Sequence, residues 1–174
     1  IPCRYVIQHL GVSGEEYDER KLDAAFDSLD EISLFARQRG VEVLLENIPN
    51  GMSSAERLVN FLAVTHLRVG FCLDTGHAHM HEGVSNAFDT LKDRLYSTHI
   101  HDNDGSDDLH LYPKLAGGTI NWRRAMHRFR SAPGQFPLVL ELRDTPEFQP
   151  PLEYVKQVFD RLEKDLQSEE REES

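Results

Sequence analysis

Five apolar segments of the sequence each end in a side chain that can bind a metal ion. The segments span residues 3–9, 41–46, 69–74, 95–101 and 136–141, and they end in His9, Glu46, Asp74, His101 and Glu141. Three of them are almost continuously apolar, which is typical of strands buried on both faces of a parallel sheet. When helices join successive parallel strands, all the strands end at one edge. We therefore expect these side chains to converge on one site.

Amphipathic segments alternate with the strands and predict five helices. They are expected at about residues 16–39, after a cap at Ser53 or Ser54, at 84–93, after a cap at Asn121, and from Pro150 or Pro151 onward. The inward faces predicted for the first and last helices include Ile32, Leu152, Phe159 and Leu166. The alternation of strand and helix predicts an α/β barrel over residues 1–166. Residues 167–174 are expected to form an acidic, disordered tail.

The chain is short for such a barrel. It has 174 residues, whereas a complete eight-stranded barrel needs about 250. It also begins with Ile1 and enters a strand almost at once. We expect an N-terminal portion to precede it. The alternative is a short protein that completes itself by self-association as a homo-oligomer.

The composition limits the classes of partner that the chain is expected to bind. With 19 Lys and Arg against 30 Asp and Glu, the formal net charge of −11 disfavours broad binding to nucleic acid or anionic membrane. No apolar stretch approaches the roughly 18 residues that span a bilayer. Both cysteines, Cys3 and Cys72, fall inside predicted strands, where they are interpreted as buried thiols in a reducing compartment. With no visible signal peptide, a cytoplasmic location is expected.

The two strand-end glutamates matter most for chemistry. Glu46 and Glu141 each follow a very apolar run. Two glutamates beside one metal can hold it and also move protons on opposite sides of a substrate. The competing interpretation is structural, with one of them paired to a buried arginine such as Arg143.

The segment from Asp74 to His79 is the densest in polar side chains. Gly76 permits a tight turn, so Asp74 and His77 can both face the pocket. The alternative is an ordinary capping aspartate beside exposed histidines.

His99 and His101 share one face of a strand because side chains alternate, with His101 placed at the mouth. Asp108 and His110 form a pair suited to a second metal or to substrate hydroxyls. A calcium loop through Asp102, Asp104 and Ser106 is disfavoured, because the bidentate glutamate that it needs is absent.

The remaining histidines offer less. His9 is a candidate ligand only because the other four strand ends also carry ligand-type residues. The histidines at positions 66, 79, 81 and 127 are interpreted as surface or supporting residues. The sequence has no Gly-x-Ser-x-Gly elbow and no standard glycine-rich phosphate loop.

Several segments together resemble the xylose isomerase-like barrel superfamily, which includes sugar isomerases, sugar epimerases and the endonuclease IV class. The matching segments are residues 45–47, 70–78, 99–103, 108–111 and 118–122. The resemblance implies a TIM (β/α)8-type barrel in which this chain supplies only the last five β/α units, strands four to eight.

The resemblance also implies a site. The central divalent metal, Mn²⁺, Mg²⁺ or Co²⁺, would be held by Glu46, Asp74, His101 and Glu141. One glutamate would remove a proton from carbon to give an enediolate and the other would return one, while His77 steadies a substrate oxygen. The substrate would be a small sugar or sugar phosphate.

The endonuclease branch is the alternative. It carries three zinc ions, and its ligand set is matched here by His9, Glu46, Asp74, His77, His101, Asp108, His110 and Glu141. Zinc-dependent cleavage at abasic DNA sites is therefore the second hypothesis, although the acidic balance makes nucleic acid an unfavoured partner. A non-catalytic remnant with an open, poorly soluble barrel interior is the third.

Two departures from the family pattern concern the substrate. The arginine that some ketose 3-epimerases use near the position of Asp108 has no counterpart here. Residues 113–118 replace the family's frequent Gly-Glu-Gly loop, so loop contacts to a substrate are expected to differ.

Overall fold

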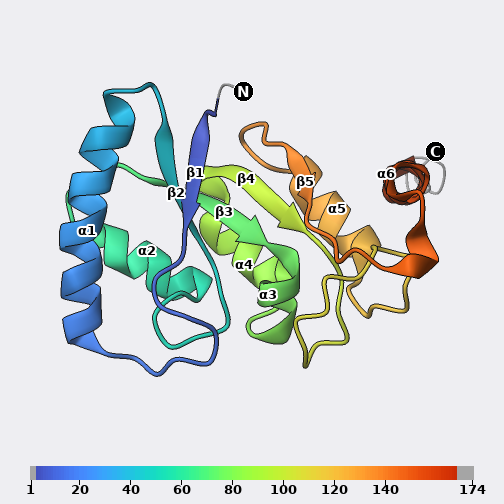
Figure 1. Ribbon diagram of the computed structural model, residues 1–174, viewed down its shortest axis with the longest axis horizontal. Coiled ribbons are helices and arrows are strands. Elements are labelled where there is room, and N and C mark those ends of the chain that lie inside the picture. The colour runs from blue at the N-terminus through green and yellow to red at the C-terminus, as the bar shows by residue number, and fades with distance from the viewer. Residues whose placement is uncertain (1–2, 168–174) are drawn as a thin grey trace.

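The computed structural model describes residues 3–167 and is built on one sheet of five parallel strands (Figure 1). The strands follow one another in space in chain order and are β1 Tyr5–Gln8, β2 Glu42–Glu46, β3 Gly70–Asp74, β4 Leu95–Ile100 and β5 Leu138–Leu140. Neighbouring strands in chain order, all parallel, are the arrangement of a barrel wall. The sheet is therefore part of a (β/α) barrel, as the sequence predicted.

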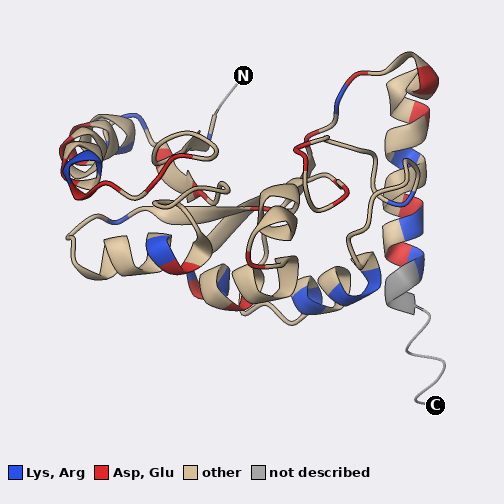
Figure 2. Cartoon of the chain, turned by 90° about the horizontal axis from the view of Figure 1, so that it is seen from below, with Lys and Arg blue, Asp and Glu red and all other residues tan. Residues whose placement is uncertain are grey.

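Helices follow the strands and cover the outer face of the sheet. They are α1 Glu19–Arg37, α2 Ala55–Ala63, α3 Thr75–Met80, α4 Val84–Leu91, α5 Trp122–Arg130 and α6 Pro151–Gln167, with short 3-10 turns at Lys92–Arg94 and Pro146–Phe148. Figure 2 shows α2, α4 and α5 in a row on one side of the sheet, with α6 beside α5. The core lies between the sheet and this row.

Side-chain oxygens cap the starts of three helices, and at two of them, α2 and α5, the cap is at a predicted position. Asp18 accepts a hydrogen bond from the backbone N–H of Arg20 at the start of α1, and Ser54 accepts one from Arg57 N–H at the start of α2. Asn121 does the same for α5. Each of these bonds satisfies an N–H that the first helical turn leaves without a partner. Of the two serines considered for α2, Ser54 is the cap.

Strand register decides which side chains face the barrel interior. Glu46 pairs with Cys72, Asp74 pairs with His99, and His99 pairs with Val139. Residues paired across parallel strands point to the same face. The inner face therefore carries residues 46, 72, 74, 99 and 141, close to the edge where the strands end.

Several expectations about burial were wrong. Cys3 precedes β1 and is exposed, whereas Cys72 is buried in β3 as predicted. Ile32, Leu152 and Phe159 are exposed, at 40%, 80% and 38%. Helical periodicity identifies an apolar stripe, but a stripe is buried only where another element packs on it, and these positions lie beyond the neighbours that the described chain provides.

The expected tail falls mainly outside the described residues. Gln167 is the last residue of α6, and residues 168–174 lie beyond the part that the structure describes, as does the side chain of Leu166. Within the described residues, none of the helices is long and apolar enough to cross a membrane.

Candidate metal centre

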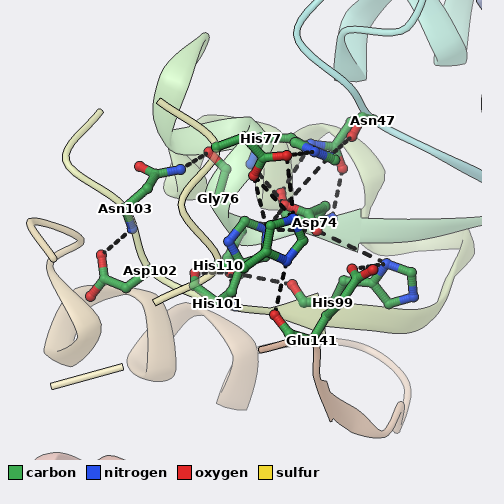
Figure 3. Close-up of polar contacts among 12 residues, drawn as sticks. Asn47, Asp74, Gly76, His77, His99, His101, Asp102, Asn103, His110 and Glu141 are labelled. Carbon is green, nitrogen blue, oxygen red and sulfur yellow. Dashed lines mark hydrogen bonds and ion pairs between the residues drawn. The ribbon is translucent and has the colours of Figure 1, made fainter. Parts of the chain in front are cut away.

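Polar side chains from every strand end meet at the carboxyl edge of the sheet (Figure 3). Glu46 and Asp74 are the last residues of β2 and β3, and Glu141 directly follows β5. His9 follows β1, and the two imidazoles of β4 and its following loop complete the set. The expected convergence of the five strand ends is present.

Glu46 is almost fully enclosed. Its side chain is 2% exposed, and its carboxylate oxygens lie 3.2 Å from His9 Nε2, 3.1 Å from His99 Nδ1 and 3.5 Å from His77 Nδ1. Burial acts to raise the pKa of Glu46, but the three imidazoles outweigh it and hold the pKa well below its usual value. Glu46 is therefore a fixed negative charge at the base of the centre.

Asp74 has two roles at once. Its Oδ1 accepts a hydrogen bond of 2.7 Å from the backbone N–H of His77 and thereby caps α3. Its two oxygens also lie 2.9 and 3.1 Å from His101 Nε2. Asn47 fixes the backbone here: its amide donates to Asp74 O at 3.0 Å and accepts from Asp74 N–H at 2.8 Å.

His77 lies where the sequence predicted, facing the centre from α3. Its Nδ1 is 3.0 Å from the carbonyl oxygen of Asn47, and its Nε2 is 3.4 Å from Asp108 Oδ2. Burial acts to lower the pKa of His77, but hydrogen bonds to Asp108 and Glu46 raise it to about 10. A bond from Nδ1–H to the carbonyl would leave Nε2 as the atom free to bind a cation.

His99 stands between the two glutamates. Its Nδ1 is 3.1 Å from Glu46 Oε2, 3.0 Å from Glu141 Oε2 and 4.0 Å from Asp74 Oδ2. Burial acts to lower the pKa of His99, but contacts with Cys72, Glu141 and Glu46 raise it far above its usual value. Glu141 is paired with this imidazole, and in the described residues Arg143 forms no salt bridge with it.

His101 directly follows β4 at the carboxyl edge of the sheet and is fully buried. Its ring stacks on that of His110, with centroids 3.9 Å apart and planes 9° apart. A side chain on Gly76 would occupy the same space, since a Cβ there would lie 1.9 Å from His101 Cε1. Burial acts to lower the pKa of His101, and the adjacent Asp74 carboxylate outweighs it and raises the pKa.

Asp108 and His110 lie on the outer side of the centre. Asp108 is 3.3 Å from His110 Nε2 and 3.8 Å from His101 Nε2. The hydrogen bond with His77 lowers the pKa of Asp108 to about 2. His110 Nδ1 is 3.0 Å from the backbone oxygen of Glu141 and so ties this loop to the end of β5.

Potential ligand atoms gather in four overlapping groups among the described residues, each within 4.8 Å of its partners. The groups are Glu46, Asp74, His99 and Glu141; Asp74, His77 and His101; His101, Asp108 and His110; and Glu46, Cys72 and His99. The sequence predicted His101 as the imidazole beside the three carboxylates. In the structure His99 occupies that place, and His101 groups with the outer residues.

Three contributors were missed by the sequence analysis. His99 was placed on the inner face but not among the ligands, because the His-x-His alternation places His101 on the same face. Cys72, two residues before Asp74, faces the same interior. Asp102 accepts hydrogen bonds from Trp122 Nε1 at 2.5 Å and from Ile120 N–H at 3.0 Å, and no spacing rule distinguishes it from the other aspartates of its loop.

The other histidines lie apart from these groups. His66 is 3.1 Å from Asp30 on the surface, His81 is 2.8 Å from Glu82, and His79 is 2.7 Å from Thr119.

The donor set suits a divalent cation. Three carboxylates and an imidazole are ligands that Mn²⁺, Mg²⁺ and Zn²⁺ accept. Within the described residues the buried Nδ1 atoms of His99 and His101 have no hydrogen bond of acceptable geometry. A cation would offset the repulsion among the clustered carboxylates.

Comparison with known proteins places the chain in a family. The family model for the xylose isomerase-like TIM barrel matches residues 1–164. Protein MJ1614 of Methanocaldococcus jannaschii is 27% identical over 124 residues, which cover 70% of this chain and 48% of that protein. The chain thus spans about half the length of this curated relative.

Solved structures share the fold. A D-tagatose 3-epimerase-like protein superimposes with a TM-score of 0.70 at 24% identity, covering 94% of this chain and 64% of its own. The 3-keto-D-glucoside 4-epimerase YcjR from E. coli gives 0.68 at 21% identity, covering 83% and 54%. A barrel protein from Mycobacterium smegmatis in complex with magnesium gives 0.65 at 17% identity, covering 94% and 62%. With the family model matching nearly the whole chain, the protein belongs to the xylose isomerase-like TIM-barrel family.

Proposed function

We propose that this chain carries the metal centre and the acid–base pair of a divalent-metal sugar or sugar-phosphate isomerase or epimerase. One observation carries the proposal: Glu46 and Glu141, from opposite parts of the sheet, both reach the same imidazole nitrogen, at 3.1 and 3.0 Å. Two carboxylates facing one centre can bind a cation and act on both sides of a small substrate.

The cation would be held by Glu46, Asp74, Glu141 and one imidazole. The sequence favoured His101 for that imidazole, and the observed distances favour His99. When bound, Mn²⁺, Mg²⁺ or Co²⁺ supplies a Lewis acid that stabilises negative charge on a substrate oxygen next to a carbonyl.

The two glutamates differ in burial, and this difference assigns them different roles in proton transfer. Glu141 has a side chain that is 47% exposed, whereas that of Glu46 is 2% exposed and surrounded by imidazoles. Glu141 can therefore reach a carbon-bound proton from the solvent side, remove it to leave an enediolate, and release the proton again. Glu46 exchanges the proton on the inner side, and His77 beside it holds a substrate oxygen.

Similar proteins support the substrate class. The names of two of the structures with this fold, a D-tagatose 3-epimerase-like protein and a 3-keto-D-glucoside 4-epimerase, specify epimerisation at carbons of sugars. Both reactions are consistent with removal of a proton next to a carbonyl group. A small soluble sugar also agrees with the net charge of −11, which does not favour polyanionic substrates. A cytoplasmic location belongs to the same proposal.

The first test combines metal analysis with proton exchange. Protein purified without chelator should contain about one Mn, Mg or Co per chain by plasma mass spectrometry. With Mn²⁺ present in D₂O, it should incorporate deuterium next to the carbonyl of a ketose from a sugar panel, as detected by NMR. Glu141→Gln should reduce this exchange by at least about 100-fold, since a positioned acid–base group contributes 10² to 10⁴.

Glu147→Gln is the matched control, because Glu147 is an exposed glutamate in the turn Pro146–Phe148 outside the centre. It should exchange at the wild-type rate. Exchange that persists at an appreciable fraction of wild type in a folded Glu141→Gln variant would show that the paired-glutamate mechanism is wrong.

A zinc phosphodiesterase acting at abasic DNA sites is the second candidate. The outer group of His101, Asp108 and His110, with His77 facing Asp108, favours it, because these residues offer ligands for further ions. Two to three zinc ions per chain and cleavage of abasic-site DNA would promote this candidate. The same protein should then show no sugar proton exchange.

A further inference from the structure

Cys72 is a buried thiol beside the metal centre that the proposed proton transfers do not use. It lies on β3 two residues before Asp74, so both side chains face the barrel interior. Its residue is 0% exposed, and strand register pairs it with Glu46 on one side and with Ser97 on the other. The sulfur is therefore held level with Glu46 and beneath Asp74.

Three different ligand atoms meet at this layer. The sulfur of Cys72, a carboxylate oxygen of Glu46 and a ring nitrogen of His99 all lie within 4.8 Å of one another. Zinc lies about 2.3 Å from sulfur and about 2.0 Å from nitrogen in proteins, so atoms at such separations can share an ion after small side-chain movements. Cysteine, histidine and glutamate are the usual ligands of zinc and of other ions that bind sulfur.

A ring nitrogen of His99 also lacks an ordinary partner. Its Nδ1 atom is buried and, among the described residues, makes no hydrogen bond of acceptable geometry. Yet Glu46 and Glu141 oxygens lie 3.1 and 3.0 Å away. Buried polar atoms are normally hydrogen-bonded, and an exception needs a cause. A cation among these donors is such a cause.

We propose that Cys72, Glu46 and His99 form a binding site for divalent cations that prefer sulfur, such as Cd²⁺ and Zn²⁺, for which Co²⁺ is a spectroscopic substitute. Binding releases the thiol proton to solvent and forms a bond between the metal and sulfur, with no change in oxidation state. Glu46 and His99 also belong to the group that contains Asp74 and Glu141. An ion that engages Cys72 therefore removes two ligands from the carboxylate-rich site.

Because the two ion positions share Glu46 and His99, an ion at one position prevents binding at the other, and this affects the enzyme's activity. Resting on the proposed function, we infer that thiophilic ions inhibit the Mn²⁺- or Mg²⁺-dependent reaction by occupying this deeper position. Oxygen ligands suit Mn²⁺ and Mg²⁺, whereas the thiolate adds affinity for the softer ions alone. The centre thus discriminates between ions through one sulfur atom.

Cobalt spectroscopy tests the sulfur ligand directly. Metal-free protein is titrated with Co²⁺, and the sulfur-to-cobalt charge-transfer absorption in the near ultraviolet is compared with the visible cobalt bands. The sequence contains two cysteines, Cys3 and Cys72, of which Cys3 is exposed. Cys3→Ser is therefore the matched control: it should keep the full charge-transfer band, whereas Cys72→Ser and Cys72→Ala should lose it but retain visible cobalt bands.

A competition measurement supplies the second readout. Displacement of bound Mn²⁺ by Cd²⁺, followed by the paramagnetic resonance signal of released Mn²⁺, should need at least about tenfold more Cd²⁺ in Cys72→Ala than in Cys3→Ser. Equal displacement in the two variants would overturn the proposal. So would a Cys3→Ser protein that binds Co²⁺ without a charge-transfer band.

Neither readout requires turnover or depends on the Cys72 variants alone. In Cys3→Ser the only thiol is Cys72, so this variant decides the matter even where substitution of a buried strand residue prevents folding. A protein that shows the charge-transfer band but exchanges no sugar protons would keep this metal site and overturn the proposed isomerase activity. A protein that exchanges sugar protons but lacks the charge-transfer band would keep the proposed isomerase activity and overturn this metal site.

Discussion

Gly76 provides the space in which the His101 ring lies. The residue is in α3, directly above the end of β4, and any side chain there would meet the buried imidazole. The close approach of α3 to β4 is thus possible only with hydrogen at this position. Since His101 contacts Asp74 and stacks on His110, the glycine also sets the spacing of the metal centre.

Gly76→Ala should therefore destabilise the protein and weaken metal binding. Overpacking in a well-packed interior costs about 1–3 kcal/mol, and here the ring cannot move without leaving Asp74. Urea unfolding monitored by circular dichroism measures the cost. Gly134→Ala is the control, because a Cβ there meets nothing within 4 Å; its effect should stay within about 0.5 kcal/mol. Equal stability of the two variants would contradict this account.

The sequence was sufficient to predict which types of residue form the centre, but not the role of every residue in it. Each expected ligand lies at a strand end because apolar strands followed by polar residues already define that edge. The choice between His99 and His101 could not be made from alternation, since both face inward. It depends on how far β4 extends relative to Glu46 and Glu141, which is a matter of tertiary register.

The loop between β4 and α5 is held by one buried carboxylate. Asp102 is 1% exposed and accepts hydrogen bonds from Trp122 Nε1 and from the backbone N–H groups of Ile120 and Asn103. These bonds join the end of β4 to the first residue of α5. The loop that carries Asp108 and His110 is therefore closed at its base.

Asp102→Ala should loosen this element. Buried donors left without an acceptor cost about 1–3 kcal/mol, so unfolding in urea should occur at a clearly lower concentration. Hydrogen exchange of the Trp122 indole should also accelerate. Asp107→Ala, at an exposed position of the same loop, should change stability by less than about 0.5 kcal/mol. The interpretation fails if both variants unfold together.

The start positions of the helices were predicted better than the burial of their faces. Ser54 and Asn121 cap α2 and α5 because a short polar side chain before an apolar period is a local signal. The short helix α3 was expected as a turn, since six residues give too little periodicity to detect. Exposure of Ile32, Leu152 and Phe159 depends on which elements pack nearby, and sequence periodicity carries no such information.

At the scale of the whole molecule, helix α5 and the centre differ in charge. Helix α5 contains four arginines and no acidic residue, and Figure 2 shows this helix in the row on one side of the sheet. The carboxylates at the strand ends instead face imidazoles. The stability of the metal-free protein should accordingly depend on the protonation of those imidazoles.

Stability and metal binding should respond to pH in opposite directions. The pKa of His77 rises from 6.5 to about 10 in the folded chain, so its stabilising contribution is complete below about pH 6.5 and is lost as the pH rises towards 10. Metal ligation needs neutral imidazole, so the stabilisation by Mn²⁺ should grow over the same range. Tm measured with chelator and with Mn²⁺ from pH 6 to 9.5 checks both trends.

His77→Gln should flatten the alkaline decline of the metal-free protein, whereas His66→Gln, at an exposed position paired with Asp30, should leave it unchanged. At the acidic end, the pKa of Asp108 is lowered from 3.8 to about 2, so its contribution is complete above pH 3.8 and is lost as the pH falls towards 2. A metal-free Tm that does not change between pH 6.5 and 9.5 would contradict the assignment.

The double role of Asp74 has an evolutionary consequence. The oxygen that accepts the His77 N–H in the first turn of α3 belongs to the carboxylate that faces His101 and the cation ligands. A substitution at this position is therefore selected against twice, once for the helix and once for the ion. Lineages that abandon catalysis should retain the aspartate longer than Glu141, whose side chain has no such duty in the fold. If a distant relative keeps this aspartate, the aspartate alone is then evidence of shared ancestry and not of catalytic activity.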